Sequence, residues 1–417
     1  MGKYFRLNTY ISFECNGKNA CIYNLASGDM ILLDEIKADI IRKCENYKEV
    51  SELNDEEVKF LDELEKMGIG RYYDEKVYIE KMILGQDPEL ESTMKKNIRF
   101  SRLFLEITNE CNLACSFCNY LDENAYRKTG CKRWISRGRR LSIEDYKDII
   151  KQSFFMGTSE IVFIGGEPLL EYKKIIELMR YAKSIGIERF TIYSNIILLN
   201  NDILESLSEF NVKFIIEVFS NNSKEFKQIC NKDIDINIYE KLKLLIKNNI
   251  EFEVKLLVCK ENEDNIENIL NELKNILSGQ KIQLDFVYPH NKIHHAKKYI
   301  DYLYNKKAKL FRVSLGVYST ISKYNNCFAN QIAVTLNGDV LPCIMTRRLS
   351  LGCVFEKSLC DIVTDGRYEN LQCLSRSKVE DCKQCVYRFG CIDCRAIELE
   401  ATNKINRTKY CECVSER

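Results

Sequence analysis

The stretch "RLFLEITNECNLACSFCNY", residues 102–120, decides the interpretation of this 417-residue chain. Its first seven residues are mostly apolar and predict a β-strand. Cys111, Cys115 and Cys118 follow directly, with the spacing C-x3-C-x2-C and no fourth cysteine in step. A zinc site normally closes with four ligands, whereas three thiolates on a four-iron cluster leave one iron open. The spacing favours an open iron–sulfur cluster, and on its own it also fits part of a zinc site.

Outward from this stretch, strands and helices alternate from residue 101 to about residue 290. The five further strands that we expect are EIVFIGG (160–166), RFTIYSN (189–195), VKFIIEVF (212–219), EFEVKLLVC (251–259) and KIQLDFVY (281–288). Six βα units in series predict a parallel sheet, closed or partly closed, with helices outside. Ligands bind such sheets at the C-terminal ends of the strands, which is where the three cysteines lie.

The flanking segments have a different character. Residues 1–83 predict a small α+β unit, with strands first and helices after. Residues 84–100 are polar, contain one of the four prolines, and are expected to be a linker. Residues 291–417 hold eleven of the twenty cysteines. We expect them to form a small cysteine-rich domain that does not continue the sheet.

Charge and cysteine usage narrow the class of protein. The chain has 62 Lys and Arg against 61 Asp and Glu, but residues 1–90 carry 12 against 19. This acidic N-terminal unit argues against binding of duplex DNA, which depends on basic side chains. The start "MGKYFRLNTY" has no signal core, and no apolar run is long enough to span a membrane. We expect a cytoplasmic protein without nucleic-acid or membrane partners, in which clustered cysteines bind metal.

Together, "CNLACSFCNY" after the first strand and "FIGGEPLL" (163–170) after the second resemble the radical S-adenosylmethionine (radical SAM) enzymes. The resemblance covers residues 101 to about 290 and implies a partial (β/α)6 TIM-like barrel. It implies that Cys111, Cys115 and Cys118 ligate a [4Fe–4S] cluster, with S-adenosylmethionine on the fourth iron. Reductive cleavage would then give methionine and a 5′-deoxyadenosyl radical.

The same resemblance implies further contacts to S-adenosylmethionine. Phe117 matches an aromatic residue that packs near the adenine. The amino group would be held by the backbone around Gly165, Gly166, Glu167 and Pro168, where two glycines permit a close approach. Other positions depart from the family pattern. Ser194 and Asn195 are candidates for the ribose or carboxylate, although Ile196 replaces a glycine, and Glu217 is a further candidate. For Ser194 and Asn195, and also for Glu217, the alternative is a structural role.

The later cysteines form a second pattern that resembles the SPASM extension of radical enzymes that modify peptides. Fifteen residues separate Cys327 from Cys343, and "CKQCVYRFGCIDC" follows at 382–394. The resemblance implies two auxiliary [4Fe–4S] clusters. The first would use Cys327, Cys343 and Cys394, with Cys353 as a candidate extra ligand. The second would use Cys382, Cys385 and Cys391, completed by Cys411 or Cys413. Two residues separate Cys391 from Cys394, whereas the family usually has three at this point. The C-x2-C pairs also fit a zinc ribbon.

Residues 1–83 resemble, in pattern, the winged-helix-like recognition element of enzymes that mature ribosomally made peptides. In that family a leader peptide adds as a strand to a sheet edge. The combined resemblance implies an oxidoreductase that abstracts hydrogen from a precursor peptide and installs a cross-link. A thioether is the first candidate for this cross-link, and flavodoxin or ferredoxin is the expected electron donor. Two alternatives stay open: a maturase of proteins, similar to the sulfatase-activating enzymes, and an iron–sulfur winged-helix regulator.

Overall fold

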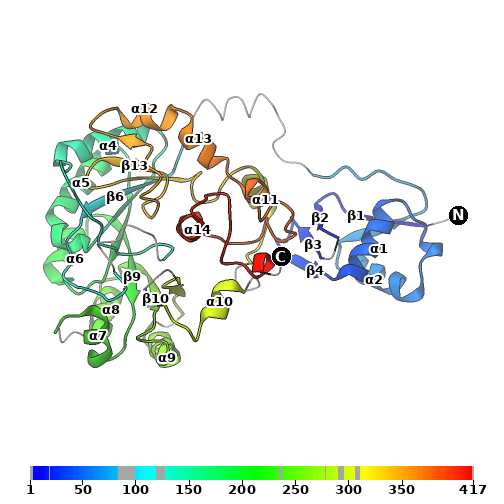
Figure 1. Cartoon of the computed structure of the whole chain (residues 1–417), viewed down its shortest axis with the longest axis horizontal. Helices are drawn as coiled ribbons and strands as arrows, with labels where there is room; N and C mark the ends of the chain where they lie inside the picture. Colours follow the sequence, from blue (N-terminus) through cyan, green and yellow to red (C-terminus); the bar gives the residue numbers. More distant parts are fainter. Residues whose placement is uncertain are drawn as a thin grey trace.

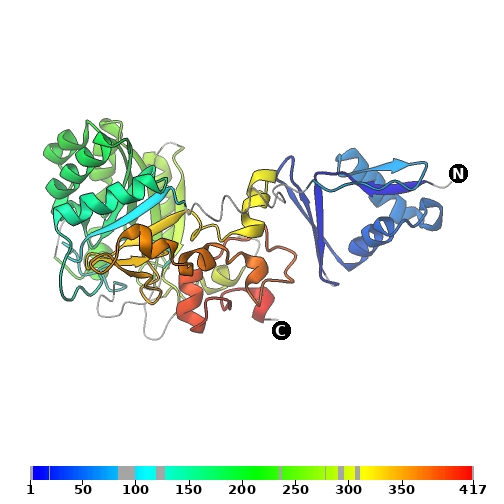
Figure 2. The same ribbon diagram turned by 90° about the horizontal axis from the view of Figure 1, so that it is seen from above.

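A computed structural model describes residues 3–17, 19–82, 99–118, 127–233, 237–277, 279–289, 295–305 and 310–415. Except for its last two residues, the linker expected at 84–100 lies outside the described residues. The barrel and the N-terminal unit lie at opposite ends of an elongated molecule, with the C-terminal segment between them (Figures 1 and 2). In the part of the chain that the structure describes, no helix is both long and apolar enough to cross a lipid bilayer.

Six neighbouring parallel strands form the barrel sheet, in the order β11-β10-β9-β8-β7-β6. Their bounds are β6 (Arg102–Thr108), β7 (Glu160–Gly165), β8 (Arg189–Ser194), β9 (Asn211–Val218), β10 (Glu251–Val258) and β11 (Ile282–Phe286). The connecting helices are α4 (Ile143–Phe155), α5 (Tyr172–Ser184), α6 (Asn201–Leu207), α7 (Ser223–Cys230), α8 (Ile238–Lys247) and α9 (Ile266–Leu277). This confirms the α/β fold with a partial barrel.

Local sequence explains where these elements begin and what they bury. Ser142 caps α4 in a reciprocal capping box with Asp145, and the Asn200 and Asn222 side chains cap α6 and α7. The central strands are buried on both faces, which is why they are nearly continuous apolar runs instead of alternating ones. The polar residues gather after the strands, at the barrel mouth.

The C-terminal segment extends the barrel sheet, which corrects the expectation that it does not continue the sheet. β12 (Gln331–Val334) pairs in parallel with β6, and β13 (Asp339–Leu341) and β14 (Gly352–Cys353) follow as antiparallel strands. Short helices complete this segment: α10 (Ile300–Tyr304), α11 (Leu315–Lys323), α12 (Leu359–Thr364), α13 (Arg367–Gln372), α14 (Arg395–Thr402) and α15 (Glu412–Ser415). The cysteine-rich segment is therefore fixed directly beside the first barrel strand.

The N-terminal unit is α+β, as expected, and its strands belong to two sheets. β1 (Tyr4–Leu7) pairs with β5 (Gly70–Tyr73), whereas β2 (Ile11–Cys15), β3 (Ala20–Asn24) and β4 (Met30–Leu33) form a separate antiparallel sheet. Two helices, α1 (Glu35–Glu45) and α2 (Asp55–Lys66), complete the unit.

The sheet of β2, β3 and β4 packs against the C-terminal segment. Tyr23 is fully buried against Val386 and Phe389, and its hydroxyl donates to the Val386 carbonyl at 2.6 Å. The rings of Tyr23 and Phe389 meet edge to face, 5.8 Å apart. Glu14 on β2 forms a close ion pair with Arg388. The N-terminal unit therefore contacts the loop between Cys385 and Cys391.

Candidate active site and iron–sulfur sites

The loop after β6 carries Cys111, Cys115 and Cys118 into a cavity of about 380 Å³ at the barrel mouth. Four other candidates line the same cavity, namely Phe117, Gly166, Asn195 and Glu217. The loop is held by backbone hydrogen bonds to the end of α7, from Ala114 N to Cys230 O at 3.0 Å and from Ser116 N to Ile229 O at 2.8 Å.

The thiols lie against apolar side chains, including Leu113, Phe117 and Phe219. Burial raises the pKa of the Cys111 thiol to about 12, and it raises the pKa of Cys115 well above the ordinary value. Buried thiols bind metal only as thiolates, so binding here must release protons. An all-thiol site with a loop around it suits an iron–sulfur cluster.

Gly165 and Gly166 let the end of β7 lie close to the backbone of the cysteine loop. The close approach that these glycines permit in the structure is therefore to the protein chain. Gly165 has φ +146°, and a Cβ there would lie 2.2 Å from Thr108 O. A Cβ on Gly166 would lie 2.0 Å from Glu110 O, next to the first cysteine. Side-chain bulk at either position would displace the loop that carries Cys111.

Gly166→Ala should therefore lower cluster content as well as cofactor cleavage. The added Cβ has no room, because the obstructing atom is backbone. We expect iron to fall by about four atoms per chain, one cluster's worth. Iron analysis of the reconstituted protein checks this. Gly316→Ala is the matched control, since a Cβ there meets nothing within 4 Å. Normal iron in Gly166→Ala would contradict the packing argument.

Glu167 connects the ends of two strands. Its carboxylate accepts hydrogen bonds from Ser194 Oγ at 2.8 Å, from Asn195 N at 2.9 Å and from Leu169 N at 3.0 Å. Burial raises its pKa to about 7, although these three donors oppose the rise. Pro168 begins a short 3-10 turn and is buried. These contacts join the side chains of Glu167 and Ser194 at the ends of β7 and β8.

Asn195 and Glu217 present polar groups to the cavity. The Asn195 amide donates to Asn112 Oδ1 at 2.9 Å and lies 3.9 Å from Cys111 Sγ. The Glu217 carboxylate pairs with Arg127 at 2.7 Å, and both side chains are at most 6% exposed. The Arg127 guanidinium also lies 5.3 Å from the centre of the Phe117 ring.

Sequence reasoning missed Arg127, although the basic segment 127–140 holds the one tryptophan of the chain, Trp134. Trp134 is buried, so this segment is anchored in the core. Cys131 and Lys132 of the same segment also line the cavity. The single tryptophan within this run of basic residues was the sequence feature that could have indicated a buried segment at the site.

Of the three thiols expected at the first auxiliary site, Cys343 and Cys394 pack in the barrel's core cluster. Burial raises the pKa of Cys343, and nearby Cys394 and Cys327 raise it further. Lys128 lies close enough to Cys327 and Cys394 to oppose the rise in their pKa values. Cys353 lies on β14, where its thiol is 3.8 Å from the Asn337 carbonyl.

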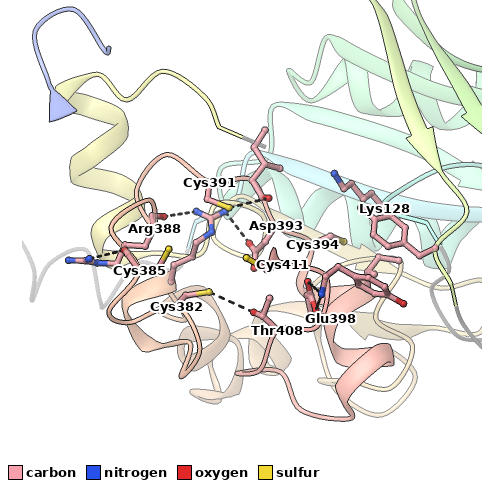
Figure 3. A pocket seen from close by; sticks show the side chains of 15 residues that line it. Lys128, Cys382, Cys385, Arg388, Cys391, Asp393, Cys394, Glu398, Thr408 and Cys411 are labelled. Carbon is pink, nitrogen blue, oxygen red and sulfur yellow. Dashed lines mark hydrogen bonds and ion pairs between the residues drawn. The ribbon is translucent and has the colours of Figure 1, made fainter. Parts of the chain in front are cut away.

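The thiols expected at the second auxiliary site line a cavity of about 570 Å³ (Figure 3). Its walls include Cys382, Cys385, Cys391 and Cys411, and Cys394 from the first site. Of the two alternatives for the last ligand, Cys411 lines this cavity, whereas Cys413 lies on α15. Within the described ranges, no three His, Cys, Asp or Glu side chains converge on the space of a single metal ion.

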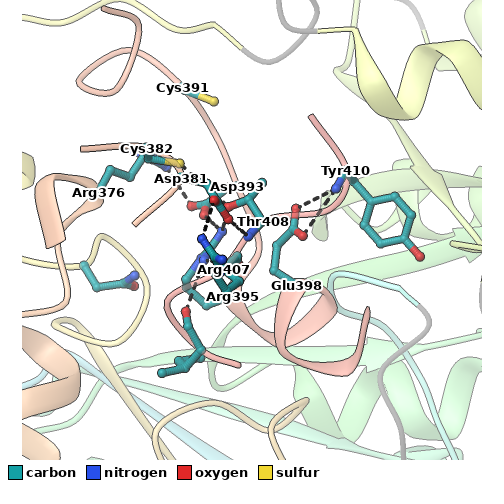
Figure 4. A network of polar contacts seen from close by, with 12 residues as sticks. Arg376, Asp381, Cys382, Cys391, Asp393, Arg395, Glu398, Arg407, Thr408 and Tyr410 are labelled. Carbon is teal, nitrogen blue, oxygen red and sulfur yellow. Dashed lines mark hydrogen bonds and ion pairs between the residues drawn. The ribbon is translucent and has the colours of Figure 1, made fainter. Parts of the chain in front are cut away.

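A buried polar network holds the segments that carry these cysteines (Figure 4). Asp393 forms ion pairs with Arg376, at 3.0 Å, and with Arg395. Burial opposes the charge on Asp393, but the two guanidinium groups outweigh it and lower its pKa to about 2. Arg395 also donates to the carbonyl of Arg407 at 2.9 Å and to Thr408 Oγ1 at 3.0 Å. The network thereby fixes the chain just before Cys411.

Two family models match the chain. The radical SAM superfamily model matches residues 105–273, and the SPASM model, an iron–sulfur cluster-binding domain, matches residues 327–386. Together they match more than half of the chain.

Among curated relatives, GTP 3′,8-cyclase from Synechocystis sp. is 26% identical over 167 residues, 40% of this chain and 48% of that enzyme. The chain thus spans about half the length of that relative. PqqA peptide cyclase from Bradyrhizobium diazoefficiens is 28% identical over 110 residues, 26% of this chain and 24% of that enzyme.

Solved structures share the fold at low identity. SuiB from Streptococcus suis, bound to its precursor peptide SuiA, matches with a TM-score of 0.50 and 16% identity, covering 97% of this chain and 98% of that one. The structure of anSMEcpe with bound S-adenosylmethionine and the Cp18Cys peptide matches with a TM-score of 0.54 and 19% identity, covering 74% of this chain and 93% of that one. The chain is a radical SAM enzyme with a SPASM iron–sulfur domain.

Proposed function

We propose that this enzyme modifies a ribosomally made precursor peptide by abstracting hydrogen from one of its residues to install a cross-link. The cross-link that we favour is a thioether. The observation that carries the proposal is the arrangement of thiols. The three thiols expected to bind the first cluster line the cavity at the barrel mouth, together with Cys131, and two further groups of thiols lie in the C-terminal segment. The N-terminal unit packs against the loop between Cys385 and Cys391. When bound, S-adenosylmethionine supplies a 5′-deoxyadenosyl radical, and the protein supplies binding, orientation and exclusion of water.

We assign the cluster ligands from the same geometry. Cys111, Cys115 and Cys118 hold the cluster that binds S-adenosylmethionine. The first auxiliary cluster takes Cys327, Cys343 and Cys394. The second takes Cys382, Cys385, Cys391 and Cys411. Cys382, Cys385, Cys391 and Cys411 line one cavity, and Cys394 of the first group also lines it, so the two sites adjoin. The hydrogen bond of Cys353 to Asn337 favours a structural role for Cys353.

The polar groups of the cavity have assigned tasks in this proposal. Asn195 and the backbone at Gly166 face the amino and carboxylate groups of S-adenosylmethionine, and Phe117 packs near its adenine. The Arg127–Glu217 pair, buried beside Phe117, closes the cavity to water. Because both members of the pair are buried, removing one leaves the other without its partner, at a cost of about 3–5 kcal/mol.

The N-terminal unit would hold the leader of the precursor peptide. In the described part of its sheet, β2 and β4 each pair with β3 on one side, so both present an edge for strand addition. The fold match to SuiB spans nearly the whole chain and so includes this unit, which favours a leader-bearing peptide over a folded protein as substrate. The electron donor would be a flavodoxin or ferredoxin.

Iron content and peptide mass together test the proposal. Reconstituted full-length enzyme should hold about twelve iron atoms per chain, three clusters' worth. Co-expression with the small peptides encoded beside its gene should give a peptide that has lost two hydrogens, detected by mass spectrometry. Iron near four atoms would refute the auxiliary assignment, and unmodified peptides would refute the substrate class.

Cys382→Ala should remove one cluster and leave the others. We expect about eight iron atoms per chain, with cleavage of S-adenosylmethionine retained, because Cys382 lies on the second auxiliary cavity only. Iron analysis and chromatography of 5′-deoxyadenosine measure the two effects. Cys360→Ala on α12 is the matched control, and full iron is expected. Stoichiometric zinc in the wild type would restore the zinc-ribbon alternative.

A further inference from the structure

Three arginines around the second auxiliary cavity have a buried Nε–H without an acceptor. Among the residues that the structure describes, these are Arg376, Arg388 and Arg395. Their other guanidinium nitrogens are all engaged, and Arg376 and Arg388 also line the cavity. A buried donor without an acceptor costs about 1–3 kcal/mol, so its position calls for a partner. Cysteine and cluster sulfurs are the acceptors that the cavity would offer.

The charged side chains around the cavity are mostly positive, which complements the negative charge of an iron–sulfur cluster. Three cations line it, from Lys128, Arg376 and Arg388, against the two acids Asp393 and Glu398. Glu398 directs its carboxyl to the amides of Lys409 and Tyr410. Arg395 adds a further cation through its pair with Asp393. With Glu14, which pairs with Arg388, four cations stand against three acids, and this excess of one positive charge suits a four-thiolate cluster, whose net charge is about −2 when oxidised.

Arg388 also reaches out of the C-terminal segment. One terminal nitrogen donates to the carbonyl of Cys385 at 3.0 Å, and the other pairs with Glu14 on β2. Both side chains of this pair are mostly buried, with 15% and 21% exposure. The guanidinium is therefore fixed between a predicted cluster ligand and the N-terminal sheet.

We propose that Arg376 and Arg388 donate their Nε–H groups to sulfur atoms of the second auxiliary cluster, and that Glu14 tunes this cluster from the N-terminal unit through Arg388. The proposal rests on the ligand assignment above. Hydrogen bonds and positive charge at cluster sulfurs favour the reduced form, which carries more negative charge. The two arginines thus make this cluster easier to reduce than it would be without them, and the unit that would hold the leader adjoins it.

Redox titration of the reconstituted full-length enzyme, followed by electron paramagnetic resonance, tests the two arginines. The second auxiliary signal is identified as the one lost in Cys382→Ala. Arg376→Met and Arg388→Met should each shift one-electron reduction about tenfold toward the oxidised cluster, or about 59 mV. Arg388→Lys, which keeps a charge and loses the Nε–H, should shift it the same way by less. Unchanged potentials with full iron, or loss of iron in every Arg388 variant, would overturn the proposal.

Glu14→Gln should shift the reduction of the second auxiliary cluster in the direction opposite to that of the arginine variants. Glutamine keeps an acceptor oxygen for Arg388 and removes the negative charge, so reduction should become about threefold more favourable. Asp29→Asn is the matched control, because Asp29 pairs with Arg312 across the same boundary at 3.4 Å and is exposed. A shift of the same sign as in Arg388→Met would show that Glu14 only holds the loop in place. Absence of any second auxiliary signal in the wild type would instead refute the ligand assignment.

Discussion

Replacing Cys115 by alanine should abolish the cleavage of S-adenosylmethionine to 5′-deoxyadenosine. Cys115 is half-buried in the middle of the loop after β6, and Cys111 and Cys118 line the same cavity. Loss of an outer-shell partner of a metal ligand already costs about 10–100-fold, so loss of a direct ligand should exceed about a hundredfold. The measurement is chromatography of 5′-deoxyadenosine from dithionite-reduced enzyme without peptide.

Cys230→Ala is the control for packing in this experiment. Cys230 is buried in the same apolar cluster, and its backbone carbonyl holds the loop through Ala114 N. An alanine keeps that carbonyl, so cleavage should persist. If Cys115→Ala turned over at the wild-type rate, the three-cysteine site would be wrong. If both variants lost activity equally, the effect of Cys115 would be one of packing.

The barrel could be predicted from sequence because its signals are local. Each strand from β6 to β11 is a segment of five to eight residues rich in apolar side chains, and α4, α6, α7 and α8 have side-chain caps. The three cysteines and the GGEP turn follow two such strands directly. Topology then brings them together, since neighbouring parallel strands end at one edge of the sheet.

The joins between the parts could not be predicted, because they depend on non-local pairing. β12 has four residues and β14 two, so neither shows a clear period, yet β12 pairs with β6 from more than two hundred residues away. Only residues 8–10 separate β1 from β2, yet these two strands belong to different sheets. The buried pair of Arg127 and Glu217 was hidden for the same reason.

A chain that begins within the linker should keep the cleavage of S-adenosylmethionine and lose the second auxiliary cluster. The loop that carries Cys111 is held by β6, α7 and the segment after residue 127, all of which remain. The loop between Cys385 and Cys391 instead loses the side chains that cover it. Tyr23 packs on Val386 and Phe389, and Met30 packs on Gly390.

We therefore expect about eight iron atoms per chain in the truncated enzyme instead of about twelve, with cleavage close to that of the full chain. Exposure of Val386 and Phe389 should also lower its unfolding temperature, because apolar surface that is now buried meets water. Iron analysis, chromatography of 5′-deoxyadenosine and thermal unfolding measure these effects. Tyr23→Phe in the full chain keeps the ring and loses the hydrogen bond to Val386, so its iron content should stay near twelve atoms.

Peptide modification separates the structural contribution of the N-terminal unit from the leader recognition that we propose for it. If the unit only raised the local concentration of the precursor, a high peptide concentration would restore modification by the truncated enzyme. Because the unit also supports the second auxiliary site, we expect modification to stay low at every peptide concentration. Full iron together with recovery at high concentration would show that residues 1–83 bind the leader and nothing more. Loss of cofactor cleavage as well would show that the catalytic barrel itself depends on them.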